Sequence, residues 1–145
     1  MSSDNAKKSS FRFEGYLIKK TSLELKSKDF DHNYHLNIRP NGTLDEEKKQ
    51  LTIELDVTVH DTHKKLNLNF IIEGAFRYES ESFEELAPYI SINGPAILFP
   101  YVRAYVSNIT ALSGCSPVIM PTLNMESTGD ILLNILRNKI TQAAK

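Results

Sequence analysis

Apolar and polar residues alternate along two neighbouring stretches in the first half of the chain. In the first stretch, Leu51 to Val59, every second residue is Leu, Ile or Val, and the residues between them are Thr, Glu or Asp. In the second, Leu66 to Ile72, Asn67 and Asn69 separate apolar residues. A period of two residues predicts strands with one buried and one wet face. The polar segment Asp61 to Lys65 predicts a hairpin between them.

Two more strands are expected upstream of this pair. The long, β-rich stretch Phe11 to Leu25 predicts a strand in which Gly15 is a candidate bulge. Tyr34 to Ile38 alternates more briefly, and the segment 40–42, Pro-Asn-Gly, predicts a turn before the charged loop Asp45 to Lys49. Strands with one wet face are typical of antiparallel sheets, so we expect four antiparallel strands in a row.

Beyond Glu79 the spacing becomes that of helices. Ser82 and Glu85 are spaced to cap a short helix over Phe83 and Leu86, and a loop over residues 89–95 is expected next. A longer helix is then predicted from five apolar residues near helical spacing: Leu98, Val102, Val106, Ile109 and Leu112. Gly114 stands where this helix is expected to end.

A loop punctuated by prolines leads to the last predicted helix, for which Thr128 or Asp130 is the expected N-cap. One broad apolar stripe runs along it: Ile131, Leu132, Ile135, Leu136 and Ile140. Strands followed by helices predict an α+β fold, here a four-stranded antiparallel sheet followed by a long helix and a C-terminal helix packed on one face. We expect residues 1–10 to form a flexible N-terminus and residues 11–145 a single domain.

Composition and charge narrow the class of protein. Apolar residues make up 41% and charged residues 24% of the 145 residues, which is ordinary for a globular domain. The formal charge of -1 lacks the basic excess that phosphate contacts need, so no nucleic-acid partner is expected. The sequence shows no signal peptide, no run of transmembrane length and a single cysteine. We therefore expect a cytoplasmic protein with no membrane partner.

Residues with catalytic or metal-binding chemistry form no convincing set. His32 and His35, and again His60 and His63, have H-x-x-H spacing, but residues three apart on a strand point to opposite faces. Cys115 follows a predicted helix end and is interpreted as an inert thiol. Because the sequence also lacks glycine-rich phosphate loops and nucleophile motifs, we expect no cofactor, no metal and no enzyme activity.

The unusual feature is the apolar content of the loop before the last helix. Five such residues lie there: Val118, Ile119, Met120, Leu123 and Met125. Two interpretations are open. These side chains pack beneath the last helix, as apolar loop residues often do, or they form an adaptable apolar surface, for which the flexible thioether of methionine suits varied partners.

Residues 94–103, GPAILFPYVR, resemble a signature of the SecB family of chaperones, in which a proline, an Ile-Leu-Phe-Pro-Tyr block and an arginine open the long helix. Gly74 and Phe76 resemble the family's Gly-x-Phe at the end of the fourth strand. The similarity extends over most of the chain, although Met125 stands where the family usually has an aromatic residue. The other matching residues are Phe11, Lys19, Ser22, Glu24, Gly114, Pro117, Pro121 and Asn124.

The resemblance implies a homotetramer built as a dimer of dimers, with helices between two outward-facing sheets. It also implies an ATP-independent chaperone that holds unfolded polypeptides or preproteins in apolar grooves and keeps them competent for translocation. Apolar segments of the client would dock there through many weak contacts. The residues expected to line the groove are Phe30, Tyr34, Ile119, Met120, Leu123, Met125, Ile131 and Ile135.

Export chaperones of this family dock on the translocase motor SecA through acidic residues of the outer sheet face and an acidic C-terminal tail. Here Lys20 stands at a position where an acidic residue is expected, and Asn67 and Asn69 replace a leucine and an acidic residue of the docking face. The chain ends Thr-Gln-Ala-Ala-Lys, and only Glu24 is left as a docking candidate. Lost acidic charge weakens complementarity to a basic partner, so we expect SecA binding to be weak or absent. A SecB-like chaperone of a toxin–antitoxin system, with an antitoxin as its client, is the alternative.

Two hypotheses come from other classes of protein. One is a dedicated interaction protein that holds a single partner, and protection of several unrelated unfolded proteins would argue against it. The other is a small-molecule enzyme or carrier that uses the groove as its pocket. That hypothesis requires convergent titratable groups, which the sequence does not supply.

Overall fold

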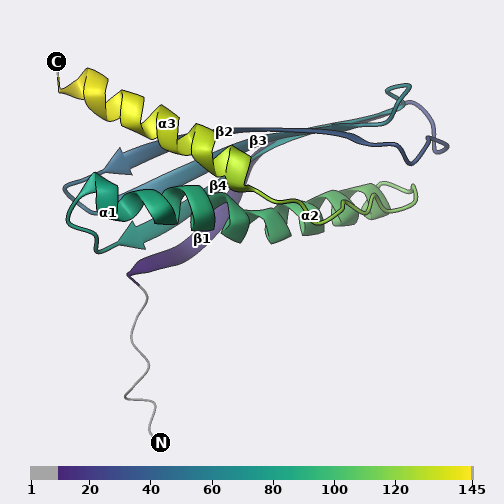
Figure 1. Ribbon diagram of the computed structural model, residues 1–145. Helices are drawn as coiled ribbons and strands as arrows, with labels where there is room; N and C mark the ends of the chain where they lie inside the picture. The colour runs from purple at the N-terminus through teal and green to yellow at the C-terminus, as the bar shows by residue number, and fades with distance from the viewer. Residues whose placement is uncertain (1–9, 145) are drawn as a thin grey trace, which may run out of the picture.

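Four antiparallel strands form one sheet, and the helices lie against one of its faces (Figure 1). The computed structural model describes residues 10–144. The strands, in the sheet order β1-β4-β3-β2, are β1 (Phe11–Leu25), β2 (His35–Asp45), β3 (Gln50–His60) and β4 (Leu66–Tyr78). The helical elements are α1 (Phe83–Pro88), η2 (Tyr89–Asn93), α2 (Gly94–Leu112) and α3 (Glu126–Ala143). The predicted α+β fold is confirmed.

The alternation in β3 and β4 places one set of side chains in the core. Ile53 and Leu55 of β3 and Phe70 of β4 are fully buried, as the two-residue period predicted. The opposite face is polar, and there the side-chain amide of Asn69 donates to the carboxylate of Asp56 at 2.8 Å. The hairpin predicted between these strands is also confirmed, since residues 61–65 connect them.

β1 is an edge strand with an irregular register. Its pairing with β4 shifts at Gly15 and again after Ile18. Gly15 has φ +142°, which side-chain-bearing residues rarely adopt, so the bulge predicted there is confirmed. Of the predicted flexible segment 1–10, only Ser10 lies within the described residues, and its hydroxyl is hydrogen-bonded to that of Tyr89 at 2.8 Å.

The turn predicted at residues 40–42 is wrong. β2 runs through Pro40 and Gly42, paired with β3 throughout, and the chain turns only at residues 46–49. Proline has no N–H to donate, but β2 is an outer strand of the sheet, where one side of the ladder needs no partner. Gly42 serves packing instead, because a Cβ there would lie 3.0 Å from the side chain of Leu132 in α3.

Two predicted helix ends are confirmed, the start of the short helix and the end of the long one. Ser82 caps α1, since its hydroxyl accepts from the N–H of Glu85 at 3.2 Å. At the other end α2 stops at Leu112, and Gly114 has φ +94°, the left-handed conformation typical of a residue just past a helix.

The loop predicted over residues 89–95 is wrong, because α1, η2 and α2 follow one another without a break. η2 is a π-helical turn, in which the N–H of Gly94 donates to the carbonyl of Tyr89. Pro95 has no N–H, so it cannot make the α-helical bond to Ser91, and the wider turn accommodates this loss. A proline that looked like a loop residue therefore lies inside a helical run.

α3 begins earlier than predicted. Its first residue is Glu126, whose N–H is bound by the side-chain oxygen of Asn124 at 2.9 Å. Thr128 and Asp130, the predicted caps, therefore lie inside the helix. The helix therefore begins at the hydrogen bond to the side-chain oxygen of Asn124. This position precedes the apolar stripe from which the helix was predicted.

Candidate functional site

Two loops meet at the end of the sheet where β2 begins. One is the segment 26–34 between β1 and β2, and the other, which we call the interhelix loop, is the segment 113–125 between α2 and α3. A cavity of about 590 Å³, which we call the groove, lies between them. It is lined by His32, Asn33, Tyr34, His35, Pro117, Ile119 and Pro121.

Three polar side chains of α2 hold the interhelix loop. The guanidinium of Arg103 donates to the carbonyl of Met120 at 3.1 Å, and the hydroxyl of Ser107 donates to the carbonyl of Val118 at 2.8 Å. The hydroxyl of Thr110 accepts from the N–H of Val118 at 2.9 Å. Residues spaced four and then three apart share one face of a helix, so the loop is fixed along that face.

This attachment decides which loop side chains face inward. Val118 and Met120 are buried, at 0% and 3% exposure, whereas Ile119 between them is 68% exposed and lines the groove. An extended segment turns successive side chains to opposite sides, which explains the pattern. Alternate residues of the apolar loop therefore pack into the core, and the residue between them faces outward.

The structure brings only some of the predicted groove residues to the surface. Ile119, Leu123 and Ile131 are exposed, while Phe30, Tyr34 and Ile135 are half-buried. The rings of Phe30 and Tyr34 meet edge to face with their centroids 6.3 Å apart. These residues come from the β1–β2 connection, the interhelix loop and α3, which lie far apart in the sequence.

Met120 and Met125 require a correction. Their side chains are 3% and 6% exposed and belong to the hydrophobic core, so neither lies open to a partner. Met120 takes the inward side of the extended loop, and Met125 immediately precedes α3. Glu24, the docking candidate, lies on β1 and is not among the residues that line the groove; its carboxylate is 3.6 Å from the ammonium of Lys26.

Polar groups beside the groove are hydrogen-bonded within the fold. Nδ1 of His32 lies 2.9 Å from the hydroxyl of Tyr34. The carboxylate of Asp31 accepts from the N–H of Asn33 at 2.9 Å and from the hydroxyl of Thr62 at 3.1 Å. Burial first, and then nearby negative groups, raise the pKa of Tyr34. Its phenol is therefore neutral near pH 7 and acts as a hydrogen-bonding group.

The histidine pairs of the sequence do not converge on one point. His35 and His60 lie opposite each other on β2 and β3, with their rings stacked at a centroid distance of 5.0 Å. Within residues 10–144 there is no group of three or more His, Cys, Asp or Glu side chains placed to hold a metal ion. The same part of the chain contains no helix that is long and apolar enough to cross a membrane.

Sequence similarity agrees with this fold. The family model for preprotein translocase subunit SecB matches residues 4–128, so the matched region ends in the first turn of α3. The chain belongs to the SecB family. The protein-export protein SecB of a Wolbachia strain of Drosophila simulans is 30% identical over 142 residues, which cover 80% of this chain and 85% of that protein. An uncharacterised protein of Methanocaldococcus jannaschii is 29% identical over 127 residues, 81% of each chain.

A solved structure shares the SecB fold. It is the SecB-like chaperone of Mycobacterium tuberculosis in complex with a peptide from the HigA1 antitoxin, and it matches with a TM-score of 0.65 at 18% identity. The match covers 79% of this chain and 91% of that one. The resemblance found in the sequence is confirmed, and chaperones of the SecB family are not enzymes.

The predicted groove set lacks five residues that line the cavity, His32, Asn33, His35, Pro117 and Pro121. It also lacks the three side chains that hold the interhelix loop, Arg103, Ser107 and Thr110. Each of these three is polar, and together they interrupt the apolar pattern of α2 at helical spacing. That spacing was the available signal, because three polar residues on one helix face beside buried positions need partners. Their partners are backbone groups of a loop, and a loop backbone leaves no pattern in the sequence.

Proposed function

We propose that this SecB-family protein is an ATP-independent chaperone that holds non-native polypeptides in the groove beside the interhelix loop. The observation that carries the proposal is Ile119, a large apolar side chain that is 68% exposed on a loop fixed by three side chains of α2. Apolar segments of an unfolded chain gain free energy by covering such a surface. A fixed wall also loses little conformational entropy when a client binds.

Two other residues of the proposed client surface are close to Ile119, one in the fold and one in the sequence. Tyr34 lines the same cavity, and Leu123 follows on the same loop. The surface needs no nucleotide or other cofactor, because binding consists of apolar contact and hydrogen bonds to an extended chain. The full set that we assign to client contact is Phe30, Tyr34, Ile119, Leu123, Ile131 and Ile135.

We assign unfolded polypeptides, including preproteins, as the clients and the cytoplasm as the place of action, in line with the family. Delivery to SecA is weak in this proposal. On the outer sheet face Lys19 pairs with Glu54 at 3.5 Å and with Glu73 at 3.0 Å, and Asn69 is bonded to Asp56. These acidic groups already have partners, so the face offers little free negative charge to a basic motor protein.

A selective client is the second candidate. The SecB-like chaperone of Mycobacterium tuberculosis was solved with an antitoxin peptide, which favours an antitoxin, or another dedicated partner, as the alternative client. Aggregation assays with several unrelated unfolded proteins distinguish the two candidates. Protection of all of them at near-stoichiometric ratio supports a general chaperone, and protection of one or none supports the selective one. Purification of bound polypeptides from the source cytosol then identifies the clients.

Substitution of Ile119 tests the groove. We expect Ile119→Asp to weaken client binding at least tenfold, about 1.4 kcal/mol, because the new carboxylate loses water when a client covers it. Fluorescence anisotropy with a labelled, permanently unfolded client measures the affinity. Leu17→Asp is the matched control, since Leu17 is 60% exposed on β1 and lies outside the groove. Met120 and Met125 are unsuitable positions, because both side chains are buried.

Both variants must keep the melting temperature and the oligomeric state of the parent protein. Unchanged client affinity in Ile119→Asp would exclude the groove as the client site. A loss of affinity confined to Leu17→Asp would move the site to the outer face of the sheet.

A further inference from the structure

A pair of histidines lies on the outer face of the sheet, at the end next to the groove. His35 of β2 and His60 of β3 are directly opposite each other in the sheet register, and their rings stack with the centroids 5.0 Å apart. The next cross-strand pair, Leu36 and Val59, packs in the core, so the two rings share the opposite face. His35 is exposed and also lines the groove, and His60 is half-buried.

The sheet register joins histidines that the sequence keeps apart. The H-x-x-H spacing places His32 with His35 and His60 with His63, and neither pair can chelate a metal along one strand. Antiparallel pairing of β2 with β3 brings one member of each pair together instead. The Cβ atoms of directly opposite residues are about 4.5–5.5 Å apart. From that separation two imidazoles can reach one metal ion at about 2.0–2.1 Å from each nitrogen.

The ring of His60 is held in the state that a metal ion requires. Its Nδ1 lies 2.8 Å from the backbone carbonyl oxygen of Asp61, and a carbonyl oxygen can only accept, so Nδ1 carries the proton. In the neutral ring Nε2 then keeps its lone pair. Metal-bound histidines almost always donate their other N–H in this way. The exposed ring of His35 can turn toward the same ion, because rotation about its Cβ–Cγ bond is soft.

The hairpin between β3 and β4 fixes this carbonyl group. Asp61 is fully buried, and its carboxylate accepts from the N–H of Leu66 at 2.9 Å. Its backbone carbonyl also accepts from the N–H of Lys64 at 3.2 Å. Within residues 10–144 the second carboxyl oxygen of Asp61, Oδ2, has no hydrogen-bond partner. A buried acceptor without a partner adds negative potential next to His60, which favours a cation there.

The neighbouring positions on this face of the sheet are uncharged. Asn37 and Thr58 form the next pair along β2 and β3 on the same face, and Asn67 lies opposite His60 on β4. These three positions therefore place no basic side chain beside the histidine pair, where it would repel a cation.

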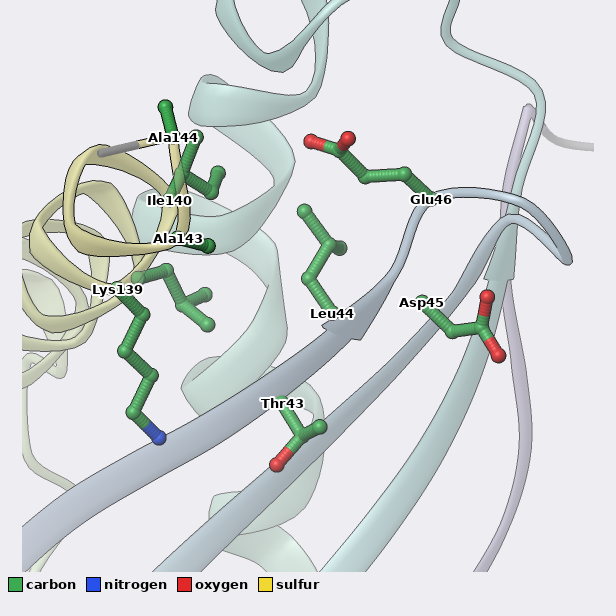
Figure 2. Close-up of a pocket in the computed structure, with 9 residues that line it drawn as sticks. Thr43, Leu44, Asp45, Glu46, Lys139, Ile140, Ala143 and Ala144 are labelled. Carbon is green, nitrogen blue, oxygen red and sulfur yellow. The ribbon is translucent and has the colours of Figure 1, made fainter.

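A cavity of about 670 Å³ at the other end of β2 lacks such convergence (Figure 2). Two carboxylates belong to its lining, but Figure 2 shows that of Glu46 pointing across the cavity and that of Asp45 pointing away. The ammonium of Lys139 in the same lining donates to the carbonyl of Gly42 at 2.6 Å. The carboxylates there cannot hold one ion together, whereas the two histidine rings lie face to face.

We propose that His35 and His60 bind one divalent transition-metal ion, Zn²⁺, Ni²⁺ or Cu²⁺, through their Nε2 atoms. Neutral imidazole suits these ions, whereas Mg²⁺ and Ca²⁺ prefer oxygen ligands. Water completes the coordination. Two protein ligands are fewer than the four of a structural zinc site, so the ion exchanges with the solution. It links β2 to β3 at the end of the sheet that carries the groove, and the site does not depend on the function proposed for the groove.

Titration of the untagged protein with Ni²⁺ tests the site, and isothermal titration calorimetry gives the affinity and the stoichiometry. We expect one ion per chain and no binding of Mg²⁺, the control ion. His35→Gln and His60→Gln should each weaken Ni²⁺ binding at least tenfold, because a single remaining imidazole cannot chelate. His32→Gln and His63→Gln are the matched controls, each from the same H-x-x-H pair as one ligand, and should keep the affinity of the parent protein.

Two results would overturn the site. Unchanged affinity in His35→Gln would show that the pair does not chelate. Losses of the same size in His32→Gln and His63→Gln would show that scattered surface histidines account for binding. Cys115→Ser should keep the affinity, and a loss there would assign the ion to the thiol instead.

Folding of the variants is checked by thermal unfolding without metal. His35 is exposed, so His35→Gln should fold normally even if His60→Gln is destabilised by loss of its bond to Asp61. Ni²⁺ should also raise the melting temperature of the parent protein and not that of His35→Gln, because an ion that binds only the folded chain stabilises it. An equal rise in both proteins would contradict the proposed link between β2 and β3.

Discussion

Gly129 is the residue on which the packing of α3 depends most directly. It is buried where α3 meets η2, against the backbone carbonyl of Ser91. The N–H that would satisfy this carbonyl in an α-helix is missing, because the residue four positions later is Pro95. A side chain at position 129 would collide with the carbonyl oxygen. Close contact between α3 and η2 therefore requires glycine.

Gly129→Ala should destabilise the protein by about 2 to 3 kcal/mol, the usual cost of forcing a methyl group into a packed contact. In a helix without this contact, alanine is favoured over glycine by about 1 kcal/mol, so the sign of the change separates packing from helix propensity. Urea unfolding followed by circular dichroism measures this variant beside Ser127→Ala, an exposed control on the same helix. Equal or higher stability of Gly129→Ala would show that α3 does not pack on η2 in this way.

Asp31 makes the loop beside the groove sensitive to acid. Burial works against its charged form, but hydrogen bonds from Asn33 and Thr62 outweigh burial and hold the pKa of Asp31 below its usual range. A depressed pKa means that folding favours the carboxylate, so this contribution to stability is present above about pH 3.9 and is lost as the pH falls through the folded-state pKa. The amide NMR resonances of Asn33 and Thr62 should therefore move only in that acidic range.

Asp31→Asn is the control for this titration, because an amide does not ionise. The acidic transition of the two amide resonances should disappear in that variant. A transition that persists there would assign the titration to another group, and the loop would not owe its acid sensitivity to Asp31.

Single residues were predictable where a local rule decides their role. Ser82 as a cap, Gly15 as a bulge and Gly114 as a helix end follow from short-range geometry, and the structure has all three. The side taken by Met120 was not predictable, because it depends on hydrogen bonds that α2 makes to a loop backbone. Ile119 was correctly predicted to lie at the surface. The prediction rested on its being an apolar residue of the interhelix loop, which is equally true of its buried neighbours.

Among the elements, the central strands were the most predictable. β3 and β4 have strand neighbours on both sides and one covered face, so the two-residue period is enforced along their whole length. The course of β2 through Pro40 depends on its place at the edge of the sheet, and the packing of η2 depends on the contact between Gly129 and the backbone of Ser91. Both features depend on how separate elements pack together, so no local sequence pattern predicts them.

The attachment of the interhelix loop to α2 can be tested at Thr110. This residue is fully buried, and its hydroxyl accepts from the N–H of Val118. Thr110→Val keeps the shape but leaves that N–H without a partner, which should destabilise the protein by about 1 to 3 kcal/mol. Thr110→Ser keeps the hydroxyl and is the matched control. Urea unfolding gives the stability, and hydrogen exchange at the amide of Val118 reports the loop directly.

Hydrogen exchange and client binding of Thr110→Val together show whether the loop is attached to α2 and whether the groove needs that attachment. Faster exchange at Val118 together with weaker client binding would show that the fixed loop is needed for the groove. Slow exchange in the valine variant, equal to that in the serine variant, would contradict the attachment, because the amide would then have another partner.

On the scale of the whole molecule, one side of α2 lacks cover. Leu98 and Val106 face the sheet and are fully buried, whereas Leu112 is 88% and Tyr101 is 37% exposed. The ring of Tyr101 lies against that of Tyr16 on β1, at a centroid distance of 4.6 Å, and Tyr16 is itself 48% exposed. Aromatic and apolar side chains that gather on one face of a small domain mark an interaction surface.

We expect this face to be covered by further copies of the chain in a homotetramer, which is the assembly that the SecB resemblance implies. Multi-angle light scattering at micromolar concentration should give the mass of four chains. Tyr101→Lys should shift the mass to a smaller species, because a charge buried between copies is costly. Ile119→Lys is the control and should leave the mass unchanged, since a groove that serves clients must stay open in the assembly. A monomer mass for the parent protein would contradict the tetramer, and dissociation by Ile119→Lys alone would place the contact between copies in the groove.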